Sequence, residues 1–226
     1  MLTQTDQIDM MAELFLDKQQ EGHREFWIPP ESEEECLARV ACASTTGERE
    51  EALGKIVLIY RAKNISNDGK YALDTRQALI RILEQHGKEC TADMLIREGA
   101  YCEKGHDFAS AVDFYVVCVR AQKTDTKLIY FSYNNLGFSL NFLQKFSEAE
   151  RYLREAIFIC PKKYNAWKNL GVSLEWQGQY EEAAGAYLKA VHLTRGEPRS
   201  QLHLKRILNR HPSLRKIPCF SIDHKV

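Results

Sequence analysis

The sequence has no excess of either charge, and this absence restricts the classes of protein that it can encode. Its 226 residues include 31 basic and 31 acidic side chains, so the formal net charge is zero. Proteins dedicated to nucleic acids gain much of their affinity by neutralising phosphates with lysine and arginine. The balanced composition therefore predicts that this chain does not bind nucleic acid.

Long apolar runs are also missing. No stretch of 18 consecutive apolar residues occurs, whereas a helix that crosses a membrane needs about 20. The first six residues lack the basic start and apolar run of a secretory signal peptide. We therefore expect no membrane interaction and a cytoplasmic location.

Motifs for metal binding and catalysis are absent as well. The seven cysteines form no Cys-x-x-Cys pair, and the seven histidines show no His-Glu-x-x-His spacing. Structural zinc sites need such clustered ligands, whereas single cysteines on apolar helix faces act as small hydrophobic residues in a reducing compartment. The phosphate-binding loop, the dinucleotide-binding glycine motif and the nucleophile elbow are missing too. The sequence therefore predicts no metal, no cofactor and no enzymatic activity.

One pattern does occur, twice, in the C-terminal half. Each copy contains a bulky aromatic residue, a Leu-Gly pair, a further large residue, and then alanines spaced seven residues apart on a second apolar segment. Equivalent residues of the two copies are 34 positions apart: Tyr133 and Trp167, Gly137 and Gly171, and Ala149 and Ala183.

This pattern resembles the tetratricopeptide repeat, a helical hairpin with a period of 34 residues. The resemblance implies an all-α fold, a right-handed superhelix of stacked hairpins (an α-solenoid) whose concave face binds other proteins. In such a fold Gly137 and Gly171 allow a neighbouring helix to approach closely. That approach offsets the roughly 1 kcal/mol that glycine costs inside a helix.

The remaining sequence is divided around these repeats. Residues 91–194 are predicted to hold three repeats, the first of them degenerate because Glu98 replaces the leucine and because Gly99 precedes Gly137 by 38 positions. We read the four extra residues as an insertion near 122–126. Helical periodicity predicts further helices at about 5–22, 32–44, 48–63, 74–86 and 198–210.

We interpret residues 1–47 as an acidic helical N-terminal extension and residues 48–90 as a helical hairpin. The hairpin is either a decayed repeat or part of a separate cap, and the sequence leaves both open. Residues 198–210 suit a capping helix with a polar outer face. Residues 211–226 form a basic tail, without a clear helical pattern from Ser213 onward.

In the family that the pattern resembles, the first helix of each repeat lines the concave groove. The resemblance therefore implies a partner-binding groove formed by the face of these helices that points away from the Leu-Gly pair. The residues that it assigns to this groove are Phe131, Asn134, Asn135, Phe138, Asn141 and Phe142 in one repeat, and Asn165, Lys168, Asn169, Val172, Glu175 and Trp176 in the next.

Asn135 and Asn169 precede the Leu-Gly pair in successive repeats. A carboxamide both donates and accepts hydrogen bonds, so it can bind the backbone of an extended peptide of any sequence. We expect both side chains to be solvent-exposed in the free protein, so that their substitution would barely affect folding. The alternative is that each simply faces solvent or caps a helix.

A variant of the family that clamps C-terminal carboxylates uses lysine and arginine at defined groove positions. The corresponding residues here are Ile96, Ala100, Asn135, Asn165 and Asn169, and only Asn135 matches. The carboxylate-clamp function is therefore not expected.

The favoured function is protein binding: an adaptor, co-chaperone or assembly scaffold that holds a peptide or helix of another protein. A second hypothesis is a self-assembling scaffold, since residues 1–36 carry ten acidic and two basic side chains, whereas residues 195–226 carry eight basic and two acidic ones. Opposite charges at the two ends can attract each other within one chain, or head to tail between copies in a homo-oligomer. An enzyme with a repeat-built recruiting arm is a third and less favoured hypothesis.

Overall fold

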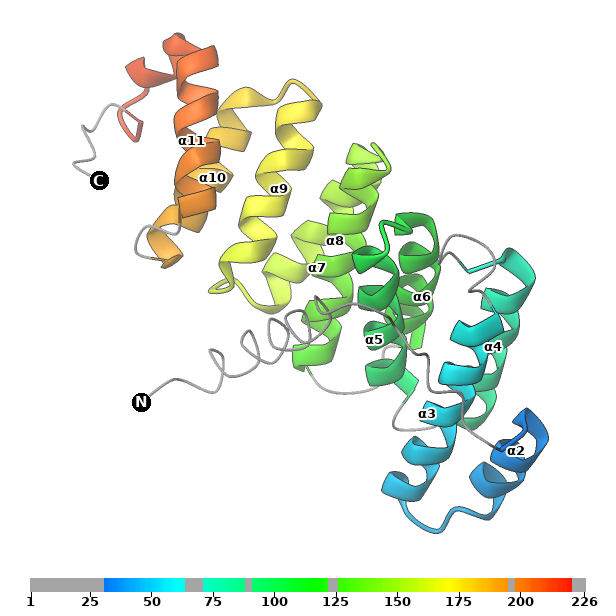
Figure 1. Cartoon of the computed structure of the whole chain (residues 1–226). Coiled ribbons are helices and arrows are strands. Elements are labelled where there is room, and N and C mark those ends of the chain that lie inside the picture. Colours follow the sequence, from blue (N-terminus) through cyan, green and yellow to red (C-terminus); the bar gives the residue numbers. More distant parts are fainter. Residues whose placement is uncertain (1–30, 64–70, 88–90, 122–125, 195–197, 221–226) are drawn as a thin grey trace.

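The computed structural model describes residues 31–63, 71–87, 91–121, 126–194 and 198–220. In these ranges the chain is α-helical and contains no strand, as the sequence predicts. Figure 1 shows the helices stacked side by side along an elongated array that runs from α2 to α11. The helices, with one 3₁₀ turn, are α2 (Glu33–Cys42), α3 (Thr46–Lys63), α4 (Leu73–His86), α5 (Thr91–Lys104), α6 (Phe108–Ala121), α7 (Thr126–Phe142), α8 (Phe146–Ile159), α9 (Tyr164–Trp176), α10 (Tyr180–Thr194), α11 (Pro198–Arg210) and η2 (Pro212–Lys216).

Three consecutive hairpins form the centre of the array: α5 with α6, α7 with α8, and α9 with α10. The first helices of these hairpins also contact one another, α5 with α7 and α7 with α9. Helix α11 joins them through an ion pair between Arg206 and Glu175 of α9, 2.8 Å apart. We call α5, α7, α9 and α11 the inner row.

A glycine on the first helix of each hairpin lies directly against the second helix. A Cβ atom on Gly99 would lie 2.4 Å from the ring of Tyr115, and one on Gly171 would lie 2.5 Å from the ring of Tyr187. At Gly137 the corresponding atom is Cγ of Leu153, at 2.4 Å. These separations are far below van der Waals contact, so the predicted packing role of the glycines is confirmed, and the first hairpin shares it.

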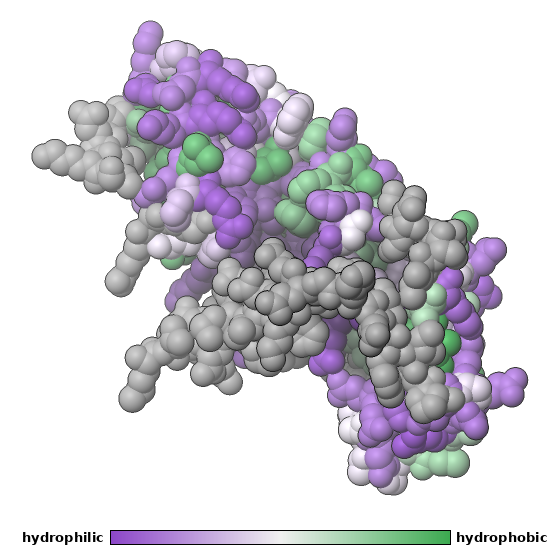
Figure 2. All heavy atoms as spheres, viewed as in Figure 1, coloured by the Kyte–Doolittle hydropathy of each residue, from purple (hydrophilic) through white to green (hydrophobic). Residues whose placement is uncertain are grey.

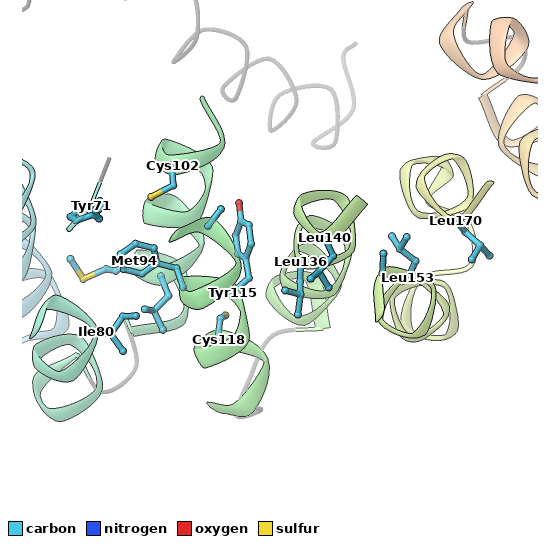
Figure 3. Close-up of a cluster of buried hydrophobic side chains, with 14 of the residues drawn as sticks. Tyr71, Ile80, Met94, Cys102, Tyr115, Cys118, Leu136, Leu140, Leu153 and Leu170 are labelled. Atoms are coloured by element: carbon cyan, nitrogen blue, oxygen red, sulfur yellow. The ribbon is translucent and has the colours of Figure 1, made fainter. Parts of the chain in front are cut away.

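The hydrophobic core is continuous along the array. It runs from Leu53 on α3 to Ile207 on α11, and both residues are completely buried. Figure 3 shows its central part, where Tyr115, Leu136, Leu153 and other side chains from successive hairpins follow one another between the helices. Each hairpin therefore buries its apolar face against its neighbours, as expected for a repeat array.

The N-terminal helices are joined to the first hairpin by a buried polar cluster. Glu98, which occupies the leucine position of the other repeats, is 2 % exposed. Its carboxylate accepts hydrogen bonds from the Arg61 guanidinium of α3, at 2.5 and 3.1 Å, and from the Tyr71 hydroxyl, at 2.8 Å. The departure from the repeat pattern at Glu98 is therefore a contact that attaches α3 and the segment before α4 to the array.

Local signals in the sequence place the N-terminal helices well. Ser32 and Glu35 form the predicted capping box at the start of α2, in which each side chain bonds the backbone N–H of the other residue. Helices α3 and α4 begin within two residues of the predicted bounds, and α4 ends at His86 with Gly87 as its C-cap. The helix predicted at 5–22 and the insertion predicted near 122–126 lie outside the described residues, apart from residue 126 itself.

The C-terminal helix α11 spans Pro198–Arg210, as the sequence predicts. The sequence shows no clear helical pattern from Ser213 onward, and the structure forms a short 3₁₀ helix at Pro212–Lys216. This segment is ordered by packing rather than by its own periodicity. Leu214 and Phe220 are each 7 % exposed and belong to the hydrophobic core.

Candidate protein-binding surface

Two aromatic side chains of the inner row project into solvent. Phe142 at the end of α7 is 55 % exposed, and Trp176 at the end of α9 is 69 % exposed. They lie 34 positions apart and therefore occupy equivalent places in successive hairpins. Figure 2 shows hydrophobic side chains gathered over the upper ends of α7 and α8, where the first helix of the hairpin turns into the second.

Each of these exposed rings stacks on an aromatic ring of the preceding hairpin. Phe108 at the start of α6 lies 4.1 Å from Phe142, with the ring planes 10° apart. Phe146 at the start of α8 lies 5.6 Å from Trp176, with the planes 1° apart. The series continues at the cap, where Tyr180 at the start of α10 stacks on His211 at 3.7 Å. We call these three pairs the aromatic series.

The sequence predicts only one ring of each of the first two pairs. Phe142 and Trp176 are among the predicted groove residues, whereas Phe108, Phe146 and Tyr180 are not. A signal was present, because an aromatic residue begins the second helix of every hairpin. Its stacking partner belongs to the following repeat, so the pairing becomes visible only when the hairpins are stacked.

The predicted asparagines form a chain of hydrogen bonds between hairpins. The Asn169 carboxamide of α9 donates to Oδ1 of Asn134 at 3.2 Å, and Asn134 donates to Oδ1 of Asn135 at 3.0 Å. Asn135 in turn donates to the Tyr115 hydroxyl of the preceding hairpin at 3.4 Å. Asn141 donates to the backbone carbonyl of Asn169 at 3.0 Å. These carboxamides therefore connect three successive hairpins.

The expectation that Asn135 and Asn169 are solvent-exposed is wrong for both, and the neighbouring Asn134 is buried as well. Asn134 is 8 % exposed and Asn169 is 6 % exposed, while Asn135 and Asn141 are half-buried. The physical reason is the close approach of neighbouring first helices, which places a carboxamide of one helix within hydrogen-bonding distance of the next. A buried polar group needs such a partner, so substitutions here should affect stability.

The half-buried Glu103, which no sequence pattern singles out, lies beside this chain of hydrogen bonds. Glu103 on α5 accepts a hydrogen bond from the Ser139 hydroxyl of α7 at 2.7 Å. Burial raises the pKa of Glu103 to about 7, although hydrogen bonds from Ser139 and Tyr115 act in the opposite direction. Burial and the nearby Glu103 also raise the pKa of Tyr115. The contact between the first two hairpins therefore contains a group that titrates near neutral pH.

The other predicted groove residues have mixed surroundings. Phe131 is half-buried and lies edge-on to Tyr130, with ring centroids 5.5 Å apart. Phe138 is half-buried and packs edge-on against Phe142. Asn165 and Lys168 are half-buried on α9. Phe131 therefore contributes mainly to packing, whereas Phe138 extends the aromatic series.

Glu175, which was predicted to face the groove, instead anchors the C-terminal cap. Its carboxylate accepts hydrogen bonds from the Tyr187 hydroxyl at 2.9 Å and from Arg206 at 2.8 Å. Arg210 lies 3.5 Å away. Burial and this carboxylate raise the pKa of Tyr187. The Glu175 carboxylate thus finds its hydrogen-bond and charge partners within the chain.

Two properties of the described residues concern other kinds of site. None of the helices they form is both long and apolar enough to cross a membrane. Within the same residues, no three histidine, cysteine, aspartate or glutamate side chains are grouped so that they could hold a metal ion.

The stacked hairpins, the packing glycines and the hydrophobic core that continues from hairpin to hairpin define an α-solenoid built of helical repeats. Comparison with known families identifies the repeat: residues 132–160, which cover most of α7 and all of α8, match the tetratricopeptide repeat. Residues 132–160 are therefore similar to one tetratricopeptide repeat, in agreement with the 34-residue pattern. Repeats of this kind are modules for protein–protein interaction.

Solved structures of similar fold include a fragment of MamA from Desulfovibrio magneticus RS-1 (TM-score 0.52, 17% identity, 73% of this chain and 90% of that one). The Sgt2 tetratricopeptide domain of Aspergillus fumigatus (TM-score 0.50, 18% identity) covers 55% of this chain and 82% of its own. The first such domain of human RPAP3 (TM-score 0.50, 20% identity) covers 56% and 96%. At these identities the similarity establishes the fold.

One curated relative is similar in sequence. It is the Drosophila melanogaster homolog of BBS4, a member of the BBSome complex, and it is 27% identical over 154 residues. The match covers 67% of this chain but 29% of the relative. This chain therefore corresponds to less than a third of that protein.

Proposed function

We propose that this chain is a protein-binding scaffold, an adaptor, co-chaperone or assembly factor that holds a peptide or helix of another protein against its inner row. The observation that carries the proposal is the exposure of Phe142 and Trp176 at equivalent places of successive hairpins. Large aromatic side chains are the most frequent energetic anchors of protein interfaces. The BBS4 homolog, which is named as a member of a complex, is consistent with a role in assembly.

Stacking pre-organises this surface. Phe108 and Phe146 hold the exposed rings at 4.1 and 5.6 Å, in nearly parallel orientations. A ring that is already fixed loses little conformational entropy when a partner covers it. The two stacked pairs therefore offer a rigid apolar edge, and Phe138 adds to it.

The test is quantitative capture of partners from cells by the wild-type chain and by a Phe142→Ala/Trp176→Ala double variant. Truncation of a buried aromatic anchor costs about 2 kcal/mol or more of binding, roughly a thirtyfold loss of affinity. Phe158→Ala is the matched control, because Phe158 is 84 % exposed but lies on α8, outside the inner row. Partners retained equally by all three proteins would refute the proposal.

A second candidate function, end-to-end self-assembly, is favoured by the charges of the described ends. Residues 31–52 contain seven acidic and two basic side chains, whereas residues 198–220 contain six basic and no acidic ones. Figure 1 places α2 and α11 at opposite ends of the array, so these ends would meet between copies. Sedimentation at low and high salt tests this function, because exposed charge pairs are screened by salt. A monomer under both conditions would refute it.

A further inference from the structure

The inner row carries a net positive charge on its surface. Its four acidic side chains are engaged within the chain: Asp93 pairs with Arg97 at 2.6 Å, Glu98 pairs with Arg61, Glu103 accepts a hydrogen bond from Ser139, and Glu175 pairs with Arg206 of the cap. The basic side chains are more numerous than these acids. They are Arg97, Lys104, Lys127, Lys168, Arg199, Lys205, Arg206 and Arg210, of which Arg97, Arg206 and Arg210 pair with these acids.

Charge and apolar groups are combined on this surface. Lys104 ends α5, and Lys168 lies on α9 two turns before the exposed Trp176. Phe138 and Phe142 lie between them on α7. A partner segment that suits this arrangement has carboxylates for the lysines and apolar side chains for the rings.

The chain itself contains such a segment, which lies outside the described residues. Residues 5–22, for which the sequence predicts a helix, include apolar residues at Ile8, Met11, Leu14 and Leu16. The same segment has one basic residue, Lys18, and five acidic ones, Asp6, Asp9, Glu13, Asp17 and Glu21. Its composition is therefore complementary to the inner row in both charge and hydrophobicity.

The point where the described chain begins allows this segment to reach the inner row. Glu31 is held on α3 by Lys55, whose Nζ lies 2.6 Å from its carboxylate. Residues 23–30 can span up to about 26 Å when extended, and packed helices are about 8–10 Å apart. Because α3 bonds directly to α5 through Arg61 and Glu98, a segment tethered at Glu31 can cross α5 and reach α7 and α9.

We propose that the inner row binds acidic amphipathic segments, and that residues 5–22 of this chain are its resident occupant. An external partner must then displace this segment, so the N-terminal residues lower the apparent affinity for partners. This inference rests on the proposed function, because both use the same surface. It adds the chemical class of the partner, an acidic segment with apolar residues on one side.

The experiment uses the full-length chain and a released variant of it, in which Ile8, Met11, Leu14 and Leu16 are all replaced by Ser. A fluorescent peptide of residues 1–22 is titrated into each protein, and its anisotropy is measured. A tethered competitor acts at an effective concentration in the millimolar range. We therefore expect the peptide to bind the released variant about tenfold or more tightly than the wild type.

Three controls define the surface and the chemistry. A peptide with the same four serine substitutions should not bind the released variant. Trp176→Ala or Lys168→Glu in the released variant should weaken binding of the natural peptide, whereas Phe158→Ala should not. Higher salt should weaken it as well, because charge contributes to the contact.

Equal binding of the peptide to both proteins, or binding to neither, would overturn the inference. A wild type that sediments as a dimer and a released variant that sediments as a monomer would also overturn it, by placing the segment on a second copy. The proposed function is tested separately. Partner capture that depends on Phe142 and Trp176, without any binding of the peptide, would leave the function standing and refute only this inference.

Discussion

Replacing Glu98 by leucine would restore the repeat pattern, and the structure predicts that it would destabilise the protein. Leu136 and Leu170 occupy the same place in the later repeats. From the pattern alone, Glu98→Leu should add apolar burial and increase stability. In the structure the Glu98 carboxylate is the acceptor for both Arg61 and Tyr71.

The size of the effect follows from what the substitution leaves behind. Burial alone would lower the pKa of Arg61, but attraction to Glu98 outweighs burial and raises it. Removing one partner of a buried ion pair costs about 3–5 kcal/mol. Because the Arg61 side chain keeps 22% of its exposure and can turn toward water, we expect the lower end, about 3 kcal/mol.

The assay is urea unfolding of Glu98→Leu, Arg61→Leu and the double variant, followed by circular dichroism at neutral pH. The double variant removes both charges and leaves no unpaired one. Its loss of unfolding free energy should therefore be smaller than the sum of the two single losses, by about 1 kcal/mol or more. Tyr71→Phe should cost less than Glu98→Leu because it removes one hydrogen bond and leaves the ion pair. A Glu98→Leu protein as stable as the wild type would show that the cluster does not stabilise the junction between α3 and α5.

Further predictions concern packing, titration and the carboxamides. Gly171→Ala should destabilise the protein by about 1–3 kcal/mol because the added Cβ would overlap the Tyr187 ring. Gly185→Ala should instead stabilise the protein by about 0.5–1 kcal/mol, because no atom lies within 4 Å of the added Cβ. Thermal unfolding of the two variants compares these effects. The raised pKa of Glu103, about 7, means that its contribution to stability is complete below pH 4.5 and is lost as the pH rises through 7. Glu103→Gln should remove up to about 3 kcal/mol of that pH dependence of the unfolding free energy. Urea unfolding of both proteins at pH 5 and pH 8 would detect the loss. A variant with the same pH dependence as the wild type would contradict the prediction. Asn169→Ala should cost about 1–3 kcal/mol because the buried Asn134 loses a donor, whereas Asn165→Ala should leave the melting temperature unchanged.

The local part of the fold could be predicted because its determinants are close in sequence. The capping box at Ser32, the glycine that ends α4 and the proline that begins α11 each act within one or two helical turns. The packing glycines could be identified because the hairpin pairs them with residues about 16 positions further along the same repeat, as with Gly171 and Tyr187. A repeated pattern reveals such contacts because each copy contains both partners.

Contacts between repeats were not predictable in the same way. The bond from Asn169 to Asn134 joins residues that occupy different positions of two repeats, so no position-by-position comparison of the copies suggests it. The stacking of Phe146 on Trp176 likewise joins different positions of two successive repeats. Glu98 was visible as a departure from the pattern, but its partner Arg61 lies 37 positions earlier, in a helix without the repeat pattern.

The division of the inner row into buried carboxamides and exposed rings decides how binding can be studied. Asn169 and Asn134 belong to the contact between hairpins, so a variant there that loses a partner would have lost stability as well. Trp176 is 69 % exposed and stacks on Phe146, so its truncation should change binding with little effect on folding. A loss of binding identifies the inner row as the partner site only when it follows from Trp176 or Phe142, in a protein that melts as the wild type does.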